Sequence, residues 1–394
     1  MSAEKTLIRD TFLPFSRPGI GEEEIAELLD SLRSGWITTG PKVERFSQDF
    51  AKYVGGKHAA ALSSATAGLH LALLAHDIGP GDEVITTPLT FAATVNMIVL
   101  VGATPVLADI DKATLQVRPE EIAKRISKRT KAIIVVHYVG DAADLDPIMA
   151  LAKKHHLAVI EDAAHAAGTE YKGKKVGSFD TTSVFSFHPN KNITTGEGGM
   201  LVTPDEEIFE RVSLLKFHGM DRNAWKRFAK AGSPRYDIAV PGFKYNMMDI
   251  QAALGIHQLP RLDGFIDARR RLAMRYNEAF KGLAGLIRPT PVAYPTRHAW
   301  HLYTPLVDLD ALTIDRDRFM QELKERNIGV GLHYTAVHEF SYYRDRFGWR
   351  AEDYPEAHFV SERIMSLPLF PALTDADQDD AIVAVREICA RFAR

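Results

Sequence analysis

Residues 184–191 read VFSFHPNK and residues 194–199 read TTGEGG, and this stretch near the middle of the chain decides the interpretation of the rest. Alternating polar and apolar residues predict a β-strand that delivers Lys191 just before a glycine-rich turn. The glycines allow the backbone to approach a bulky ligand closely, and Pro189 shortens the strand. A lysine among aromatic and apolar neighbours loses its charge more easily, as an amine that forms a Schiff base requires. The ordinary alternative is a solvated lysine at a strand end.

A second stretch, IEDAAH at residues 160–165, runs from an apolar strand into a carboxylate. This pattern places Asp162 at the carboxyl edge of a sheet, where α/β proteins bind ligands. A carboxylate there could pair with a pyridinium nitrogen and keep it protonated, so that the ring accepts electrons. The structural alternative is that Asp162 caps the N-terminus of a helix.

The third stretch, SSATAGLH at residues 63–70, opens an apolar helix that we predict over residues 69–76. Free backbone N–H groups and the helix dipole make such an N-terminus a natural seat for phosphate. Plain N-capping by Ser64 or Thr66 would explain the same residues. Each stretch alone is weak evidence, but the three together favour a single ligand site.

Strand-like runs alternate with helix-like stretches over most of the chain, which predicts an α/β fold with a large, mostly parallel sheet. Residues 84–108 carry no charge, but their prolines and threonines favour strand, helix and turn over a membrane span. The predicted strands are 83–87, 104–108, 132–136 and 157–160, and the predicted helices between them are 119–127 and 145–155.

Beyond the sheet, residues 261–280 predict one long charged helix that leads into a smaller C-terminal unit. In that unit we expect a strand over 300–307, a helix over 315–326 and a last helix at the end of the chain. We therefore predict a large domain over residues 1–270 and a small domain over residues 271–394, packed together rather than tethered.

The bulk composition is that of an ordinary globular protein, with 394 residues, 46% hydrophobic and 25% charged. A net charge of −3 gives no basic footprint for nucleic acid or an anionic membrane surface, so we expect neither as a partner. Cys389 is the only cysteine, which excludes an intrachain disulfide and fits a reducing compartment. We expect a cytoplasmic protein.

These stretches resemble the DegT/DnrJ/StrS family of sugar-nucleotide aminotransferases. The likeness extends over nearly the whole chain and includes SGWITTGP at 34–41, GDEVI at 81–85, KYN at 244–246 and GLHY at 331–334. It implies the fold-type I, aspartate-aminotransferase-like architecture, with a small C-terminal α+β domain. It also implies the cofactor pyridoxal 5'-phosphate (PLP) and a homodimer in which one subunit completes the active site of the other.

The resemblance also implies a role for individual residues. Lys191 would form the Schiff base with the cofactor and shuttle the proton, and Asp162 would pair with the pyridine nitrogen. The other implied cofactor-binding residues are Thr66, Ala67 and Ser186 at the phosphate, Phe91 stacked on the ring, His165 near the 3-oxygen, and Asn246 reaching the phosphate of the neighbouring subunit.

Within the family, LPFSRP at 13–18, HAWHL at 298–302 and SLPLFP at 366–371 are most similar to enzymes that aminate a UDP-4-keto-pentose of the 4-amino-4-deoxy-L-arabinose type. The implied donor is L-glutamate, which leaves as 2-oxoglutarate, and the implied pathway makes lipopolysaccharide or another cell-surface glycan. Those enzymes carry Trp where this chain has Phe91, and residues 221–240, which can face the sugar, fit poorly. UDP-4-keto-6-deoxy-HexNAc and GDP- or dTDP-4-keto-6-deoxyhexoses therefore stay open as substrates.

Three other classes of protein share part of this pattern. Sugar dehydratases of the same family carry His in place of the lysine, so Lys191 favours transamination. A non-catalytic regulator on the same fold would have no need to retain the lysine, the carboxylate and the phosphate seat together. A metal enzyme could use the pair His298 and His301, or His155 and His156, but no third ligand is evident, and we expect no metal site.

Overall fold

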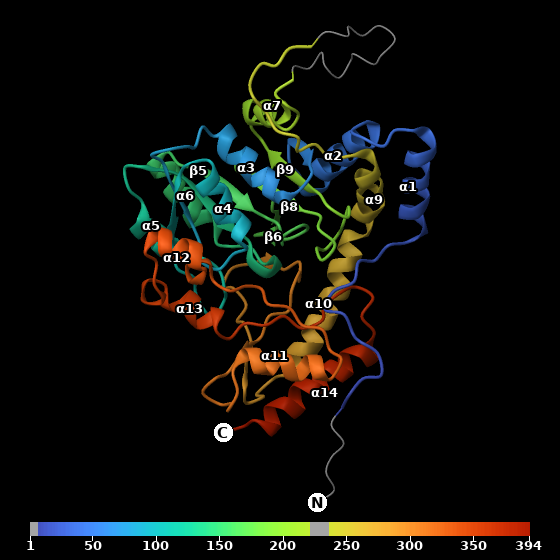
Figure 1. The fold of residues 1–394 in the computed structure, drawn as a ribbon, viewed down its shortest axis with the longest axis vertical. Coiled ribbons are helices and arrows are strands. Elements are labelled where there is room, and N and C mark those ends of the chain that lie inside the picture. Colours follow the sequence, from blue (N-terminus) through green and yellow to red (C-terminus); the bar gives the residue numbers. More distant parts are fainter. Residues whose placement is uncertain (1–6, 221–235) are drawn as a thin grey trace, which may run out of the picture.

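The computed structural model describes residues 7–220 and 236–394, and its centre is a seven-stranded sheet with the order β1-β9-β8-β5-β4-β2-β3 (Figure 1). Only β9 runs against its neighbours, so the expected large, mostly parallel sheet is confirmed. The strands are β1 His58–Leu62, β2 Glu83–Thr86, β3 Thr104–Leu107, β4 Thr130–Val136, β5 Ala158–Asp162, β8 Thr182–Ser186 and β9 Gly199–Thr203.

Helices surround this sheet and build the lower part of the molecule (Figure 1). The helices before the long connector are α1 Glu22–Ser34, α2 Pro41–Val54, α3 Ala65–Ala75, α4 Ala92–Leu100, α5 Pro119–Arg125, α6 Leu145–His155, α7 Glu206–Leu215 and α9 Asp249–Gln258. The connector and the helices after it are α10 Leu262–Ala279, α11 Arg316–Glu325, α12 Ser341–Phe347, α13 Pro355–Ser361 and α14 Asp375–Arg391. Two-residue strands complete the fold: β6 Glu170–Tyr171, β7 Lys174–Lys175, β10 Leu286–Ile287, β11 Thr296–Arg297 and β12 Leu306–Val307.

The register of the sheet positions the candidate site. Asp162, the last residue of β5, pairs with Val136 at the end of β4 and with Val184 in β8. All five residues of β8 are buried, and the buried Ser183 donates a 2.8 Å hydrogen bond to Glu161 on the neighbouring strand. The carboxyl ends of three parallel strands therefore meet at one edge, beside Asp162.

Most predicted elements appear within one or two residues of their expected bounds, but two differ. The helix predicted over 69–76 begins at Ala65, because the Ser64 side chain caps it by accepting a hydrogen bond from the N–H of Ala67. The strand predicted over 300–307 is wrong except at its end, in β12. Its backbone groups bond elsewhere: the N–H of Leu302 donates to the carbonyl of Val139, which belongs to an irregular turn rather than to a strand.

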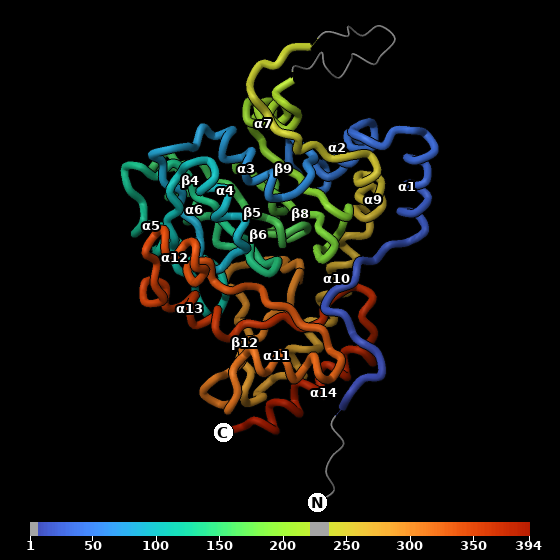
Figure 2. The backbone as a smooth tube through the Cα atoms, viewed as in Figure 1, coloured from blue at the N-terminus to red at the C-terminus, as the bar shows by residue number. Residues whose placement is uncertain are grey.

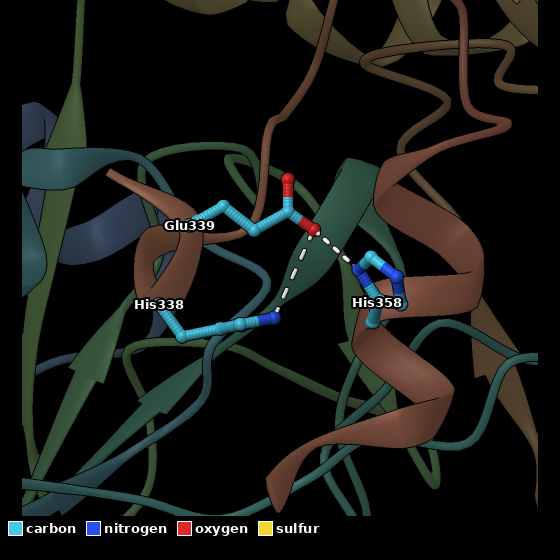
Figure 3. A group of neighbouring side chains, drawn as sticks. All are labelled: His338, Glu339 and His358. Atoms are coloured by element: carbon cyan, nitrogen blue, oxygen red, sulfur yellow. Dashed lines mark hydrogen bonds and ion pairs between the residues drawn. The ribbon is translucent and has the colours of Figure 1, made fainter. Parts of the chain in front are cut away.

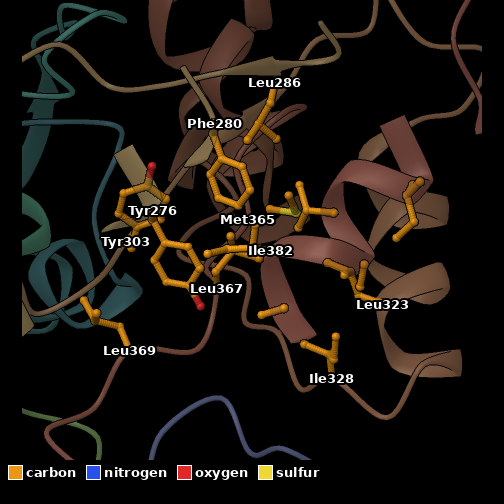
Figure 4. Packing of buried hydrophobic residues seen from close by; sticks show 14 of the residues in the cluster. Tyr276, Phe280, Leu286, Tyr303, Leu323, Ile328, Met365, Leu367, Leu369 and Ile382 are labelled. Carbon is orange, nitrogen blue, oxygen red and sulfur yellow. The ribbon is translucent and has the colours of Figure 1, made fainter. Parts of the chain in front are cut away.

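The small C-terminal unit has its own apolar core around α10 (Figure 4), in which Tyr276 and Phe280 pack against Tyr303. The N-terminal segment runs along this unit (Figure 2), where Leu13 bridges to Ile328 and Arg9 pairs with Asp377 at 2.6 Å.

The division of the chain at residue 270 stays a prediction, since α10 runs through that position without a break. Two helices that follow α11 pack against the large sheet rather than into the small core. Tyr343 of α12 and Ala357 of α13 share a cluster with Leu89 and Val95.

Within the described ranges, the structure contains no helix that combines the length and the apolar character needed to cross a bilayer.

Candidate active site

A cavity of about 290 Å³ opens at the carboxyl edge of the sheet. It gathers residues from six separate parts of the chain, from α3 and the start of α4 to the segment before α12. Six of the eight residues predicted for the site line it: Thr66, Phe91, Asp162, His165, Ser186 and Lys191.

Lys191 reaches the cavity from a turn, not from the strand itself. Strand β8 ends at Ser186, and the N–H of Lys191 bonds to the carbonyl of His188 at 2.9 Å. Burial lowers the pKa of Lys191 to about 8, although the negative charge of Asp162 opposes the shift. The neutral amine is therefore accessible near neutral pH, as a nucleophilic lysine requires.

Asp162 is held in one orientation by two hydrogen bonds. Thr94 of α4 donates to one carboxylate oxygen at 2.7 Å, and the N–H of Ala164 donates to the other at 3.2 Å. Burial raises the pKa of Asp162 despite these hydrogen bonds and the nearby charge of Lys191. A buried carboxylate of this kind gains from a cation placed beside it, such as a protonated pyridine ring.

The N-terminus of α3 forms the polar end of the cavity, with Thr66 and, from β8, Ser186. The first N–H groups of a helix have no partner within it and attract anions. The chain at Gly199 passes so close to this turn that a Cβ there would lie 2.5 Å from the carbonyl carbon of Ser64. Glycine is therefore needed at position 199, where the chain packs against the turn at the start of α3.

Two predicted residues do not line the cavity. The N–H of Ala67 is taken by the Ser64 cap at 3.1 Å. Asn246 is buried beside α2, where its amide donates to the hydroxyl of Thr39 at 2.6 Å. Residues 221–235 of the segment expected to face the sugar lie outside the described residues.

Sequence reasoning missed a pair of cavity-lining side chains, His333 and Tyr334. Tyr334 hydrogen-bonds through its hydroxyl to Nε2 of His165 at 3.0 Å, and His333 also lines the cavity. Burial and the nearby charge of Lys191 lower the pKa of His165 well below its ordinary value, so its imidazole is neutral. The sequence marks the GLHY stretch only through its family resemblance, because its distance from residue 165 along the chain gives no sign of contact.

The arrangement fits PLP. Lys191 offers a desolvated amine, Asp162 a carboxylate that gains from a cation, and the start of α3 a seat for phosphate. Nδ1 of His165 is buried and, among the described residues, has no hydrogen-bond partner, so it is available to a polar ring substituent.

Glu161, next to Asp162, points away from the cavity into a buried network. It hydrogen-bonds to Nε2 of His137 at 2.6 Å and accepts from Thr181 and Ser183. Burial opposes its ionisation, but these hydrogen bonds outweigh burial and lower the pKa of Glu161.

We expect Glu161→Ala to lower the free energy of unfolding by about 3 kcal/mol at pH 7, because it leaves buried polar partners unpaired. The contribution of ionised Glu161 to the free energy of unfolding is present above its ordinary pKa of 4.5 and is lost as the pH falls through its lowered pKa in the folded protein. The difference in stability between wild type and Glu161→Ala should therefore be smaller in acid. Urea unfolding at pH 7 and pH 4 measures both effects. Glu352→Ala, at an exposed position, is the matched control and should change stability by less than about 0.5 kcal/mol; an equal loss in both variants would contradict the buried network.

The histidine pairs considered for a metal make other contacts. The ring of His301 packs 4.4 Å from that of His165, and the ring of His298 stacks on Trp300 at 4.0 Å. In the described ranges neither His298 and His301 nor His155 and His156 belong to a group of three metal-ligating side chains.

Comparison with known proteins identifies the family of the chain. The model of the DegT/DnrJ/EryC1/StrS aminotransferase family matches residues 18–386. The spore coat polysaccharide biosynthesis protein SpsC of Bacillus subtilis is 49% identical over 381 residues, which cover 96% of this chain and 98% of SpsC.

Two solved structures are similar over their whole length. The putative sugar aminotransferase Spr1654 of Streptococcus pneumoniae, in its PLP form, has a TM-score of 0.89 and 33% identity, covering 96% of this chain and 99% of that one. PseC of Helicobacter pylori, an aminotransferase involved in the biosynthesis of pseudoaminic acid, has a TM-score of 0.89 and 30% identity, covering 97% and 100%. The chain therefore belongs to the DegT/DnrJ/EryC1/StrS family and is a PLP-dependent sugar aminotransferase of fold-type I.

Proposed function

We propose that this enzyme transfers the amino group of L-glutamate to the 4-keto carbon of a nucleotide sugar, namely a UDP-4-keto-pentose of the 4-amino-4-deoxy-L-arabinose type. The observation that carries the transamination is that Lys191, Asp162 and the N-terminus of α3 converge on one cavity. Support for the pentose comes from the stretches at 13–18, 298–302 and 366–371. The product would enter the biosynthesis of a cell-surface glycan such as lipopolysaccharide.

When bound, the cofactor supplies an electron-accepting ring and carries the amino group between the two substrates. Lys191 would hold it and then remove and return the proton at the reacting carbon. Asp162, oriented by Thr94, would keep the ring nitrogen protonated, while Thr66 and Ser186 hold the phosphate. Phe91, which is 59% exposed at the mouth of the cavity, would stack on the ring.

Ala67 and Asn246 would contribute to the cofactor site without lining the cavity of their own chain. The N–H of Ala67 supports the cap that orders the phosphate seat. Asn246 would reach the phosphate of a neighbouring subunit. Glutamate leaves as 2-oxoglutarate before the sugar binds, so the kinetics should be ping-pong.

Two observations favour other nucleotide-linked keto sugars as substrates. Phe91 stands where the pentose enzymes carry Trp, and the similar protein PseC takes part in making pseudoaminic acid. UDP-4-keto-6-deoxy-HexNAc and GDP- or dTDP-4-keto-6-deoxyhexoses are the alternatives.

The test is a coupled assay of purified enzyme with glutamate and a panel of UDP-, GDP- and dTDP-linked 4-keto sugars, which follows 2-oxoglutarate release. The proposal expects the highest kcat/KM with the UDP-4-keto-pentose. A preference of tenfold or more for another sugar would replace the pentose, and no turnover with any of them would reject the nucleotide-sugar assignment.

We also propose that the enzyme is a homodimer with shared active sites and that it works in the cytoplasm. Helix α1 and the turn after it expose an apolar stripe at helical spacing, made by Ile25, Leu29, Leu32 and Trp36, each between 42% and 55% exposed. Contiguous exposed apolar surface of this kind marks a protein interface. The only cysteine, Cys389, is free and buried, which suits a reducing compartment.

Leu29→Glu should therefore convert the dimer into monomers and reduce activity, because a charge would be buried in the interface. Sedimentation velocity measures the change. Val383→Glu is the matched control, since Val383 is also 42% exposed but lies on α14, far from α1 (Figure 1). A wild-type protein that sediments as a monomer would contradict the proposal.

A further inference from the structure

Away from the PLP cavity, three side chains bring metal-ligating atoms together. The short helical turn η3 (Val337–Glu339) carries His338 and Glu339, and α13 carries His358 (Figure 3). One nitrogen or oxygen atom from each of the three side chains lies within 4.8 Å of the other two. None of the three lines the cavity that contains Lys191.

The distances suit a small divalent cation. Oε1 of Glu339 lies 2.8 Å from Nδ1 of His358 and 3.8 Å from Nε2 of His338 (Figure 3). Two ligand atoms bound to one tetrahedral zinc ion are roughly 3.4 Å apart, given zinc–ligand bonds of about 2.1 Å. Small side-chain rotations would therefore place all three atoms around one ion. Two imidazoles and one carboxylate are a donor set that zinc uses in proteins.

The buried ring of His338 is an independent indication of a ligand site. Its side chain is only 1% exposed, and among the described residues neither ring nitrogen has a hydrogen-bond partner. A buried polar atom without a partner costs free energy, so such atoms are rare in native proteins. A cation bound at Nε2 would satisfy that nitrogen.

Glu339 is already held in a ligating orientation. Ser361 donates a 2.9 Å hydrogen bond to its Oε2, and the Ser361 hydroxyl itself accepts one from the N–H of Ala336 at 2.9 Å. Outer partners that fix a ligand in this way are typical of metal sites, where they raise affinity. Oε1 is thereby turned towards the two histidines.

We propose that His338, Glu339 and His358 bind one divalent transition-metal ion, with Zn²⁺ as the preferred ion. The fourth position would face solvent, since the side chains of Glu339 and His358 are 26% and 36% exposed. The ion would join η3 to α13 and so brace the segment that follows Tyr334. The site is separate from the cavity that contains Lys191.

The test is isothermal titration of the tag-free, chelator-treated holoenzyme with ZnCl₂. We expect one ion per chain, and at least about tenfold weaker binding in Glu339→Gln and in His358→Ala. These two residues are preferred to His338, whose removal from a buried position could prevent folding. His155→Ala, which removes an exposed histidine on α6, is the matched control and should bind zinc like the wild type.

MgCl₂ should not bind in the same experiment, because magnesium prefers all-oxygen sites. Zinc binding that is absent, or equally strong in Glu339→Gln and His358→Ala, would overturn the proposal. The visible absorbance of bound PLP should be the same in both variants, which separates a failure of this site from a failure of the PLP assignment.

Discussion

Lys191→Ala is expected to reduce turnover by at least about 10³-fold, because proton transfer by a positioned side chain contributes roughly 10²–10⁴-fold and the variant would also lose the proposed attachment point of the cofactor. The structure supports this size of effect: burial lowers the pKa of Lys191 to about 8, and its amine faces a cavity that also contains Asp162. Single-turnover kinetics with glutamate measures the rate. The absorbance of the Schiff base between Lys191 and the cofactor, near the visible edge, should disappear in the same variant.

Two controls distinguish a role of Lys191 in proton transfer from a purely structural role. Lys153→Ala removes an exposed lysine on α6 and should keep full activity. Added methylamine should partly restore proton transfer in Lys191→Ala, since a small amine can occupy the space of the lost side chain. A Lys191→Ala protein with wild-type turnover would remove Lys191 from the mechanism.

Asp162→Asn is expected to lower kcat by about 10²–10³-fold, the usual cost of removing one preorganised charge or dipole from a reacting centre. A neutral amide would leave the ring nitrogen unprotonated and the ring a poorer electron acceptor. Stopped-flow measurement of the glutamate half-reaction isolates this step. Thr94→Val keeps the carboxylate but removes the 2.7 Å hydrogen bond that orients it, together with the bond between Thr94 and Thr90, so the fall in kcat should be smaller.

Asp162→Asn should not lower the thermal stability of the cofactor-free protein. The folded pKa of Asp162 is raised above 3.8, so its carboxyl favours folding below that pH and opposes folding as the pH rises through the folded pKa. At neutral pH the Asp162→Asn substitution would remove a buried charge, and the melting temperature without cofactor should stay the same or increase.

Unchanged turnover in Asp162→Asn would show that the carboxylate has no part in catalysis.

Most of the cavity was predictable because its residues follow strand ends. Asp162 lies at the end of β5 and Lys191 shortly after β8, and the ends of neighbouring parallel strands must meet. Thr94 was not predictable, because its contact with Asp162 depends on how α4 packs over the sheet. The cluster of His338, Glu339 and His358 could not be predicted either, since it joins two elements that only tertiary packing places side by side.

The sequence by itself determined the α/β class and the order of the central elements, and it singled out Lys191 and Asp162 as candidate site residues. These properties are local, because periodicity, strand ends and glycine-rich turns act over a few residues. Only the tertiary structure decided that Glu161 turns into the core while its neighbour Asp162 turns into the cavity, and that Tyr334 meets His165. Successive residues of a strand face opposite sides of the sheet, and packing alone determines which side holds the site.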